Sequence, residues 1–189
     1  NNVIKLSEQA LVNGKLLSNT YDPGTDKTTV VAVTPNSAPV AVADAITVAE
    51  GGTATLVDGG ATSVLTNDTD VDNNTLTAAV ETSPTNGSLT LNSNGTFSYV
   101  HDGTETTSDS FSYKANDGTV DGNTVTVSIA ITSVNDAPVA VADAITVAEG
   151  GTATTLVGGE TSVLTNDTDA ENNTLTAAVV TSPSNGSLT

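Results

Sequence analysis

Short stretches in which apolar and polar residues alternate run through most of this chain. Every second residue of 124–131 is Val or Ile, and residues 96–99 and 110–113 place Phe or Tyr at every second position. A period of two puts one set of side chains on the same face of a strand. These stretches are therefore predicted to be half-buried strands, although the chain as a whole is polar and poor in aromatic residues.

Turn-forming residues separate the alternating stretches. Gly, Asn, Asp and Pro gather at 84–87, 92–95 and 116–118, where turns need short polar side chains or positive φ angles. Strands are expected near 40–48, 53–57, 76–81, 88–91, 96–100, 109–115 and 123–132, with a short helical turn at 63–65. Seven short strands of this spacing are typical of an all-β, immunoglobulin-like Greek-key sandwich.

A long internal repeat sets the domain organisation. Residues 36–90 align without gaps with residues 135–189 at an offset of 99, and 46 of the 55 pairs are identical. A repeat of about 100 residues is too long for one turn of a solenoid and fits a complete domain. We expect a tandem array, with a complete repeat at 36–134 and an incomplete second repeat at 135–189.

Residues 1–35 do not match the repeat. Asn13-Gly14 is a hairpin signal, because this pair accepts a type I′ turn, and Asp22-Pro23-Gly24 predicts another turn before a strand at 28–33. This N-terminal β segment has three interpretations: the end of a preceding domain, a cap, or donor strands that complete the sandwich of another chain.

The charge excludes some partners. The chain carries 22 acidic residues, four lysines and no arginine, which gives a formal charge of −18. Such an excess opposes binding to nucleic acid and to anionic membrane surfaces, and it favours cations. There is no cysteine, and no apolar run reaches the roughly 18 residues of a membrane span, so membrane insertion is not expected.

The most distinctive polar stretch is NDTDVDNNTL at 67–76, which returns as NDTDAENNTL at 166–175. Crowded carboxylates repel one another unless water, a proton or a cation intervenes, and Ca²⁺ takes six to eight oxygen ligands. The first candidate ligands are the alternating acidic residues Asp68, Asp70 and Asp72, and then Asp167, Asp169 and Glu171. The alternative is a solvated loop whose Asn and Asp residues cap turns.

This stretch is not an EF-hand. Asn73 stands where an EF-hand needs Gly, and Ala79 stands where it needs a bidentate Glu. Other loops would have to add ligands. Glu50 and Glu149 are candidates because each precedes two glycines, although solvated charge explains them equally well. Weaker candidates are Asp44, Asp102, Asp117 and Asp143.

Three longer motifs carry a resemblance to a known family. NGSLTLNSNGTFSYV at 86–100, DSFSYKANDG at 109–118 and VNDAPV at 134–139 resemble the tandem cadherin-like and VCBS repeats of large bacterial surface proteins, including RTX-type adhesins. The resemblance implies a calcium-binding cadherin-like β-sandwich, secretion, and a place in adhesins, biofilm proteins or multimodular extracellular enzymes.

The linker motif resembles the one between cadherin domains. By this resemblance Asn135 and Asp136 would bind calcium at the junction of the repeats. Ser37 stands at the position equivalent to Asp136, so the first repeat departs from the pattern. We expect weaker calcium binding, or none, in front of that repeat.

Catalysis has little support in the sequence. His101 is the only histidine, and we interpret it as a loop residue beside Asp102 rather than a base or ligand. No serine lies in a nucleophile-elbow pattern, and the chain has only five Phe or Tyr and no Trp to stack on a sugar. The chain is therefore expected not to be an enzyme.

Three hypotheses for function follow. The leading one is a calcium-stabilised structural spacer of an extracellular adhesin or biofilm protein on the bacterial surface, whose partners are neighbouring repeats of the same chain. The second is a self-assembling extracellular filament subunit that exchanges strands between identical chains. The third is a polysaccharide-binding module of a secreted multimodular protein.

Overall fold

The computed structural model describes residues 10–12, 15–22, 27–33 and 35–188. Its first part is an antiparallel sheet of three strands, β1 (Ala10–Val12), β2 (Lys15–Asp22) and β3 (Lys27–Val33), in that order. The strand predicted at 28–33 is present. Asn13-Gly14 and residues 23–24, where turns were predicted, lie outside the described residues.

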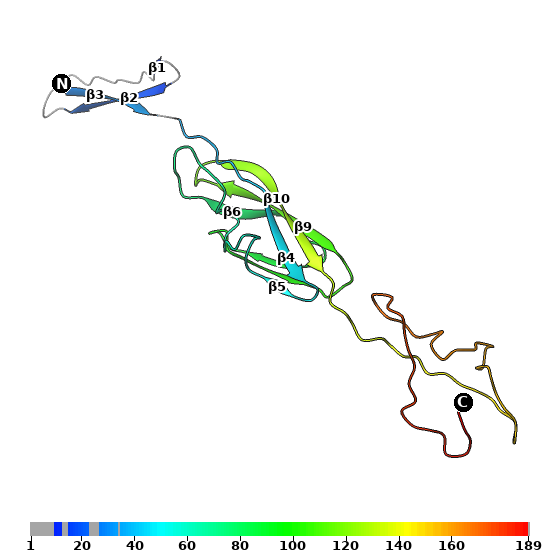
Figure 1. Cartoon of the computed structure of the whole chain (residues 1–189). Helices are drawn as coiled ribbons and strands as arrows, with labels where there is room; N and C mark the ends of the chain where they lie inside the picture. Colours follow the sequence, from blue (N-terminus) through cyan, green and yellow to red (C-terminus); the bar gives the residue numbers. More distant parts are fainter. Residues whose placement is uncertain (1–9, 13–14, 23–26, 34, 189) are drawn as a thin grey trace.

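The first repeat folds as a sandwich of two sheets (Figure 1). The larger sheet has the order β4-β10-β9-β6 and the smaller one β5-β8-β7. Strands β4 and β10 run parallel, with Ile129 opposite Ile46, while the other neighbours are antiparallel. The seven strands are β4 (Asp44–Ala49), β5 (Thr53–Ala54), β6 (Thr77–Thr82), β7 (Gly87–Leu91), β8 (Phe97–His101), β9 (Ser108–Asn116) and β10 (Asp121–Thr132).

The seven predicted strands all occur, but two are shorter than expected. The first begins at Asp44 rather than residue 40, because the preceding backbone does not pair with the backbone of a strand. The Val40 N–H donates to the Thr69 carbonyl (2.8 Å), and the Ala41 N–H donates to Asn123 Oδ1 (2.9 Å). The second ends at Ala54. Where a short helical turn was predicted at 63–65, residues 63–66 form a turn in which the Thr66 N–H donates to the Ser63 carbonyl (3.3 Å).

The core lies between the sheets and consists of the alternating apolar residues. Phe97, Tyr99, Phe111 and Tyr113 are at most 4% exposed, and the two Phe rings lie 6.5 Å apart. Val127, Ile129 and Ile131 of β10 join them. The period of two therefore predicted the buried face correctly.

The second repeat keeps the loops of the first. The reciprocal bond between Val40 and Thr69 recurs between Val139 and Thr168, and φ is 58° at Asn73 and 60° at its counterpart Asn172. Residues 135–188 align with the part of the first repeat before β8, so they contain no counterparts of β8, β9 and β10. Described residues 135–188 form no strand, and no described helix is long and apolar enough to cross a membrane.

Candidate functional site

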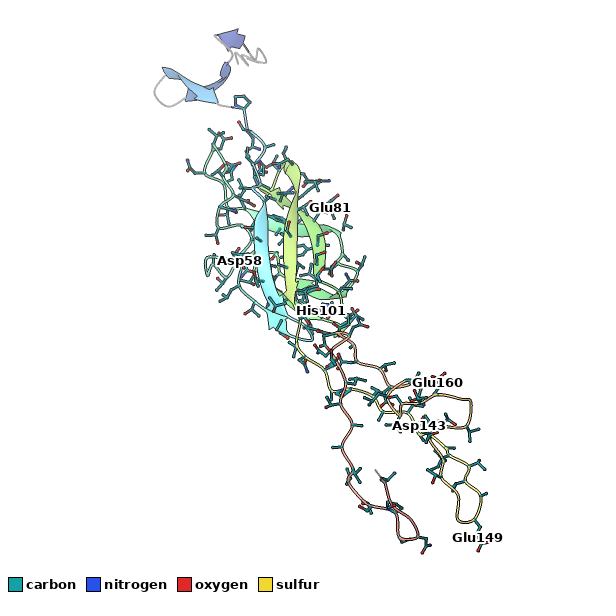
Figure 2. All side chains as sticks on the ribbon, turned by 45° about the vertical axis from the view of Figure 1, so that its right-hand side comes forward. Asp58, Glu81, His101, Asp143, Glu149 and Glu160 are labelled. Atoms are coloured by element: carbon teal, nitrogen blue, oxygen red, sulfur yellow. The ribbon has the colours of Figure 1, made fainter. Side chains whose placement is uncertain are left out.

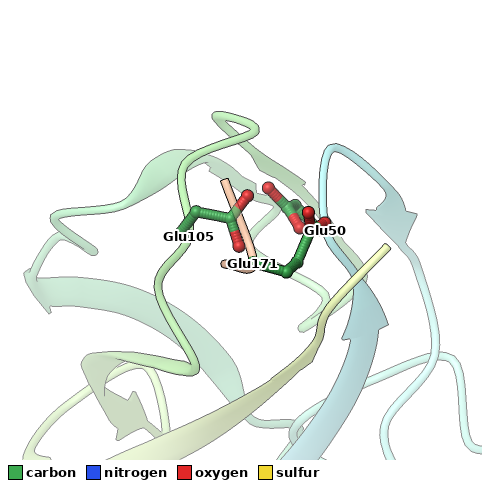
Figure 3. Close-up of side chains that lie close together, drawn as sticks. All are labelled: Glu50, Glu105 and Glu171. Atoms are coloured by element: carbon green, nitrogen blue, oxygen red, sulfur yellow. The ribbon is translucent and has the colours of Figure 1, made fainter. Parts of the chain in front are cut away.

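Three glutamates from distant parts of the sequence meet where the two repeats join. One carboxylate oxygen from each of Glu50, Glu105 and Glu171 lies within 4.8 Å of the other two (Figure 3). Glu50 follows β4, Glu105 lies in the loop between β8 and β9, and Glu171 belongs to the second copy of the acidic stretch. We call these three residues the junction cluster.

A tight turn after β4 positions Glu50. The Glu50 N–H donates to the Thr132 carbonyl at the end of β10 (2.8 Å), and the Gly52 N–H closes the turn on the Ala49 carbonyl (2.8 Å). Gly51 has a φ of +63°, a conformation that costs other residues energy. The Glu50 carboxylate then accepts the N–H of Val134 (3.1 Å), so it faces the linker between the repeats.

Glu171 reaches the same linker from the second repeat. Its Oε1 accepts the N–H of Asp136 (2.7 Å). Its Oε2 is buried and has no hydrogen-bond partner among the described residues. A buried carboxylate oxygen without a partner is costly, and such an atom commonly marks a position that an ion or water fills.

The three carboxylates of the junction cluster repel one another. The pKa of Glu105 is raised, first by desolvation and then by the negative charges of Glu50 and Glu171. Lys114 is the only lysine after residue 27, and it pairs with Glu81 (3.2 Å). Since no positive side chain within residues 35–188 pairs with the three carboxylates, a cation or a proton would stabilise them.

The donor set of the junction cluster fits Ca²⁺. Two oxygens bound to one calcium ion at about 2.3–2.6 Å lie at most about 5 Å apart, which agrees with the 4.8 Å limit on the carboxylate oxygens. All three donors are hard oxygen ligands, and carboxylates can bind either through one oxygen or through both. Glu50, Glu105 and Glu171 are therefore the residues that would hold the ion.

Asp68 does not join the junction cluster. Its carboxylate accepts the Val42 N–H (2.8 Å) and the hydroxyl of the buried Tyr113 (3.0 Å). That hydroxyl also lies 3.4 Å from Asp44. Desolvation and the nearby charge of Asp68 raise the pKa of Asp44 to about 6.

Asp70 and Asp72 shape the loop that contains them. Asp70 Oδ1 accepts the N–H groups of Asp72 (2.8 Å) and Asn74 (3.1 Å), and Asp70 Oδ2 is buried without a partner among the described residues. Asp72 Oδ2 accepts the Ser37 N–H (2.7 Å). Asp72 thus binds the linker before the first repeat just as Glu171 binds the linker before the second.

The remaining predicted ligands in the second repeat are dispersed. Asp167 accepts the Val141 N–H (2.8 Å), and Asp169 accepts the Asn173 N–H (2.8 Å). Asn135 Oδ1 accepts the Asn173 side-chain amide (2.8 Å). Asp136 is exposed, and its charge contributes to the raised pKa of Glu105. Glu149 is exposed on a loop well away from His101 (Figure 2).

Sequence reasoning missed two residues of this region. Glu105 lies in neither acidic stretch, and its counterpart would fall beyond residue 189, so the repeat gave no signal for it. The interpretation of His101 as a loop residue is wrong, because His101 ends β8 and is only 3% exposed. Its Nδ1 accepts the N–H groups of Gly51 (3.1 Å) and Gly103 (3.2 Å), so it connects the loops that carry Glu50 and Glu105.

Comparisons with known proteins identify both repeats. The model of the bacterial cadherin-like domain matches residues 36–133, and the model of a bacterial Ig domain matches residues 135–189. A search of curated proteins gives no match.

Two solved structures of an endo-fucoidan hydrolase from glycoside hydrolase family 107, one of them a variant, are similar to this chain. They have TM-scores of 0.36 and 0.34 and identities of 17% and 18%, over 67% and 68% of this chain. The matched part spans 20% of each enzyme chain.

The family matches confirm the predicted resemblance and the all-β sandwich class. Modules of these two kinds are typical of secreted or surface multidomain proteins. The chain belongs to the bacterial cadherin-like domain family and carries a cadherin-like domain followed in tandem by a bacterial Ig domain.

Proposed function

We propose that this chain is a calcium-stabilised, non-catalytic spacer of an extracellular bacterial adhesin or biofilm surface protein. The observation that carries the proposal is the junction cluster, in which both repeats contribute carboxylates to one point beside the linker. Bound calcium would supply the positive charge that three glutamates and a buried, unpartnered oxygen lack.

The residues of the junction cluster already hold the linker. Glu50 accepts the N–H of Val134, and Glu171 accepts the N–H of Asp136. Since Glu50 belongs to the first repeat and Glu171 to the second, a ligand shared by both would join the repeats directly. Ion binding is then linked to the stability and the relative orientation of the repeats.

A spacer role agrees with the burial of the aromatic and histidine side chains in the sandwich. Its four aromatic side chains are at most 4% exposed, so they are not available to stack on a sugar. The sole histidine is buried, and its Nδ1 already accepts two backbone N–H groups. These observations disfavour the polysaccharide-binding and catalytic alternatives.

Strand exchange by residues 1–35 stays a prediction. Deletion of that segment, followed by measurement of the size of the assemblies, would test it.

Calorimetric titration of calcium into the metal-free chain tests the proposal. We expect the wild-type chain to bind, and Glu171→Gln to bind at least about tenfold more weakly, because it loses a charged ligand. Glu149→Gln is the matched control, since Glu149 also lies in the second repeat but is exposed and outside the junction cluster. Absence of binding, or equal weakening in both variants, would overturn the proposal.

A further inference from the structure

The only histidine of the chain lies beneath the two loops that bring Glu50 and Glu105 together. Its side chain is buried at the end of β8. The ring contacts Gly51, directly after Glu50, and both Gly103 and Thr106, which flank Glu105. One side chain therefore bonds to the backbone beside one glutamate and to residues on both sides of the other.

The contacts determine which tautomer the neutral His101 ring adopts. Nδ1 receives the N–H groups of Gly51 (3.1 Å) and Gly103 (3.2 Å), so it acts as an acceptor and carries no hydrogen. The hydrogen of the neutral ring is then on Nε2, which lies 2.9 Å from Thr106 Oγ1 and donates to it. With both nitrogens engaged, His101 is not available as a cation ligand.

The two N–H groups on Nδ1 belong to turns that contain a glycine at positive φ. Gly51 and Gly103 have φ angles of +63° and +82°, and each turn presents its N–H toward the ring. Both bonds are partly buried. An apolar side chain at position 101 would leave both N–H groups without their acceptor and would favour a rearrangement of both turns. Such a rearrangement would move Glu50 and Glu105 apart.

The loop after His101 is fixed by a further set of bonds. Asp102 Oδ1 accepts both the N–H (3.1 Å) and the hydroxyl (2.7 Å) of Thr104. These bonds order residues 102–104 locally, but none of them reaches the Glu50 turn. In the described structure, His101 is the side chain that bonds to both turns.

We infer that His101 is a positioning residue for the junction cluster. It sets the separation of Glu50 and Glu105, and therefore the affinity of the site, without contacting the cation. This inference rests on the proposed function and adds a residue that positions two of the ligands through hydrogen bonds to their loops.

Two substitutions at position 101 test the inference in the full chain, with calcium as the probe. His101→Phe keeps a ring but removes both hydrogen-bonding nitrogens, and we expect about tenfold weaker calcium binding, because two backbone N–H groups lose their acceptor. His101→Asn places an amide oxygen near the Nδ1 position and should restore most of the affinity. Tyr99→Phe is the control. Tyr99 lies in the same strand, and the substitution removes its hydroxyl, which donates to Asp109 (2.9 Å).

The control separates positioning from general stability. Tyr99→Phe should lower the unfolding temperature without calcium and leave the calcium affinity unchanged. If His101→Phe binds calcium as tightly as the wild type while Glu171→Gln does not, the inference fails and the proposed function stands. If the wild type does not bind calcium, both fail.

A spectroscopic measurement keeps the inference testable if His101→Phe does not fold. The ¹⁵N spectrum of the wild-type imidazole near neutral pH should show hydrogen on Nε2 and none on Nδ1. A hydrogen on Nδ1 would overturn the inference, because that nitrogen could not then accept from Gly51 and Gly103.

Discussion

At the scale of single residues, Glu171 and Asp72 show how one position serves both repeats. Each accepts the N–H of the residue that follows the first Asn of its linker, Asp136 or Ser37, and both distances are 2.7 Å. Glu171 is one methylene longer than Asp72. One of its oxygens lies within 4.8 Å of oxygens of Glu50 and Glu105, and its Oε2 is buried without a partner among the described residues. The same loop position can therefore bind a linker and also contribute to a metal site.

Glu105 is predicted to have opposite effects with and without calcium. In metal-free solution Glu105→Gln should raise the unfolding temperature by a few degrees, because a charge repelled by Glu50 and Glu171 is removed. In saturating calcium, the unfolding temperature of Glu105→Gln should rise less than that of the wild type. Differential scanning calorimetry with Glu149→Gln as control measures both, and a variant that matches the wild type under both conditions would exclude Glu105 from the site.

Asp44 is predicted to make stability depend on pH. Its pKa is about 6 in the folded chain against a usual value of 3.8, so the folded state holds this proton after the unfolded state has released it. The free energy of unfolding therefore falls as pH rises from about 4 to 6 and stays lower above that range.

Asp44→Asn isolates this contribution. At pH 7 in metal-free solution it should raise the free energy of unfolding by on the order of 1 kcal/mol, since the side chain is only partly buried, and the difference from the wild type should shrink toward pH 4. Denaturant titrations of both chains between about pH 4 and pH 7 measure this difference in the free energy of unfolding. A difference that does not vary with pH would contradict the assigned shift.

The sequence predicted only part of the junction cluster. Glu50 was visible because it precedes two glycines, and Glu171 because it belongs to a repeated acidic stretch. Glu105 has neither signal, and only the pairing of β8 with β5 and β7 brings its loop toward the Glu50 turn. The first acidic stretch is oriented by bonds that were equally invisible in the sequence. Asp68 and Asp72 accept the N–H groups of the distant residues Val42 and Ser37, and Asp70 accepts the N–H of Asp72.

At the scale of elements, alternation predicted the strands but not their partners. Strands β8, β9 and β10 were predicted to within two residues because Phe, Tyr, Val and Ile occupy every second position. The parallel pairing of β4 with β10 connects residues more than 80 positions apart, and no local pattern encodes it. The late start of β4 has the same origin, because the Val40 N–H bonds to a distant loop at Thr69 and the Ala41 N–H bonds to the Asn123 side chain of β10.

The repeat supplies a matched pair of core substitutions. Ile46 is fully buried opposite β10, whereas its counterpart Ile145 is 59% exposed. Ile46→Ala should therefore lower the free energy of unfolding by about 2–5 kcal/mol, and Ile145→Ala should change it by less than about 0.5 kcal/mol. Chemical denaturation measures both values, and equal losses would show that the two repeats pack alike.

At the scale of the whole molecule, the proposed function implies that the charge of −18 and the junction cluster would make the arrangement of the repeats respond to cations. Without a cation, the repulsion among Glu50, Glu105 and Glu171 opposes close contact between the repeats. With calcium, the same residues would hold the repeats together. The proposed spacer is then stiff in calcium and flexible without it.

Small-angle scattering tests this change in stiffness. Calcium should narrow the distribution of dimensions of the wild-type chain, and Glu171→Gln should abolish the effect, because the variant leaves the second repeat without its ligand. Glu149→Gln should behave as the wild type does. A calcium response that survives in Glu171→Gln would place the relevant ion elsewhere.

Diffraction from crystals of the chain grown in calcium would show directly whether an ion joins the repeats. We expect an ion at the junction of the repeats, with oxygens of Glu50, Glu105 and Glu171 about 2.3–2.6 Å from it. Saturating calcium with no ion at the junction cluster, or ions bound only by Asp68, Asp70 and Asp72, would contradict this expectation.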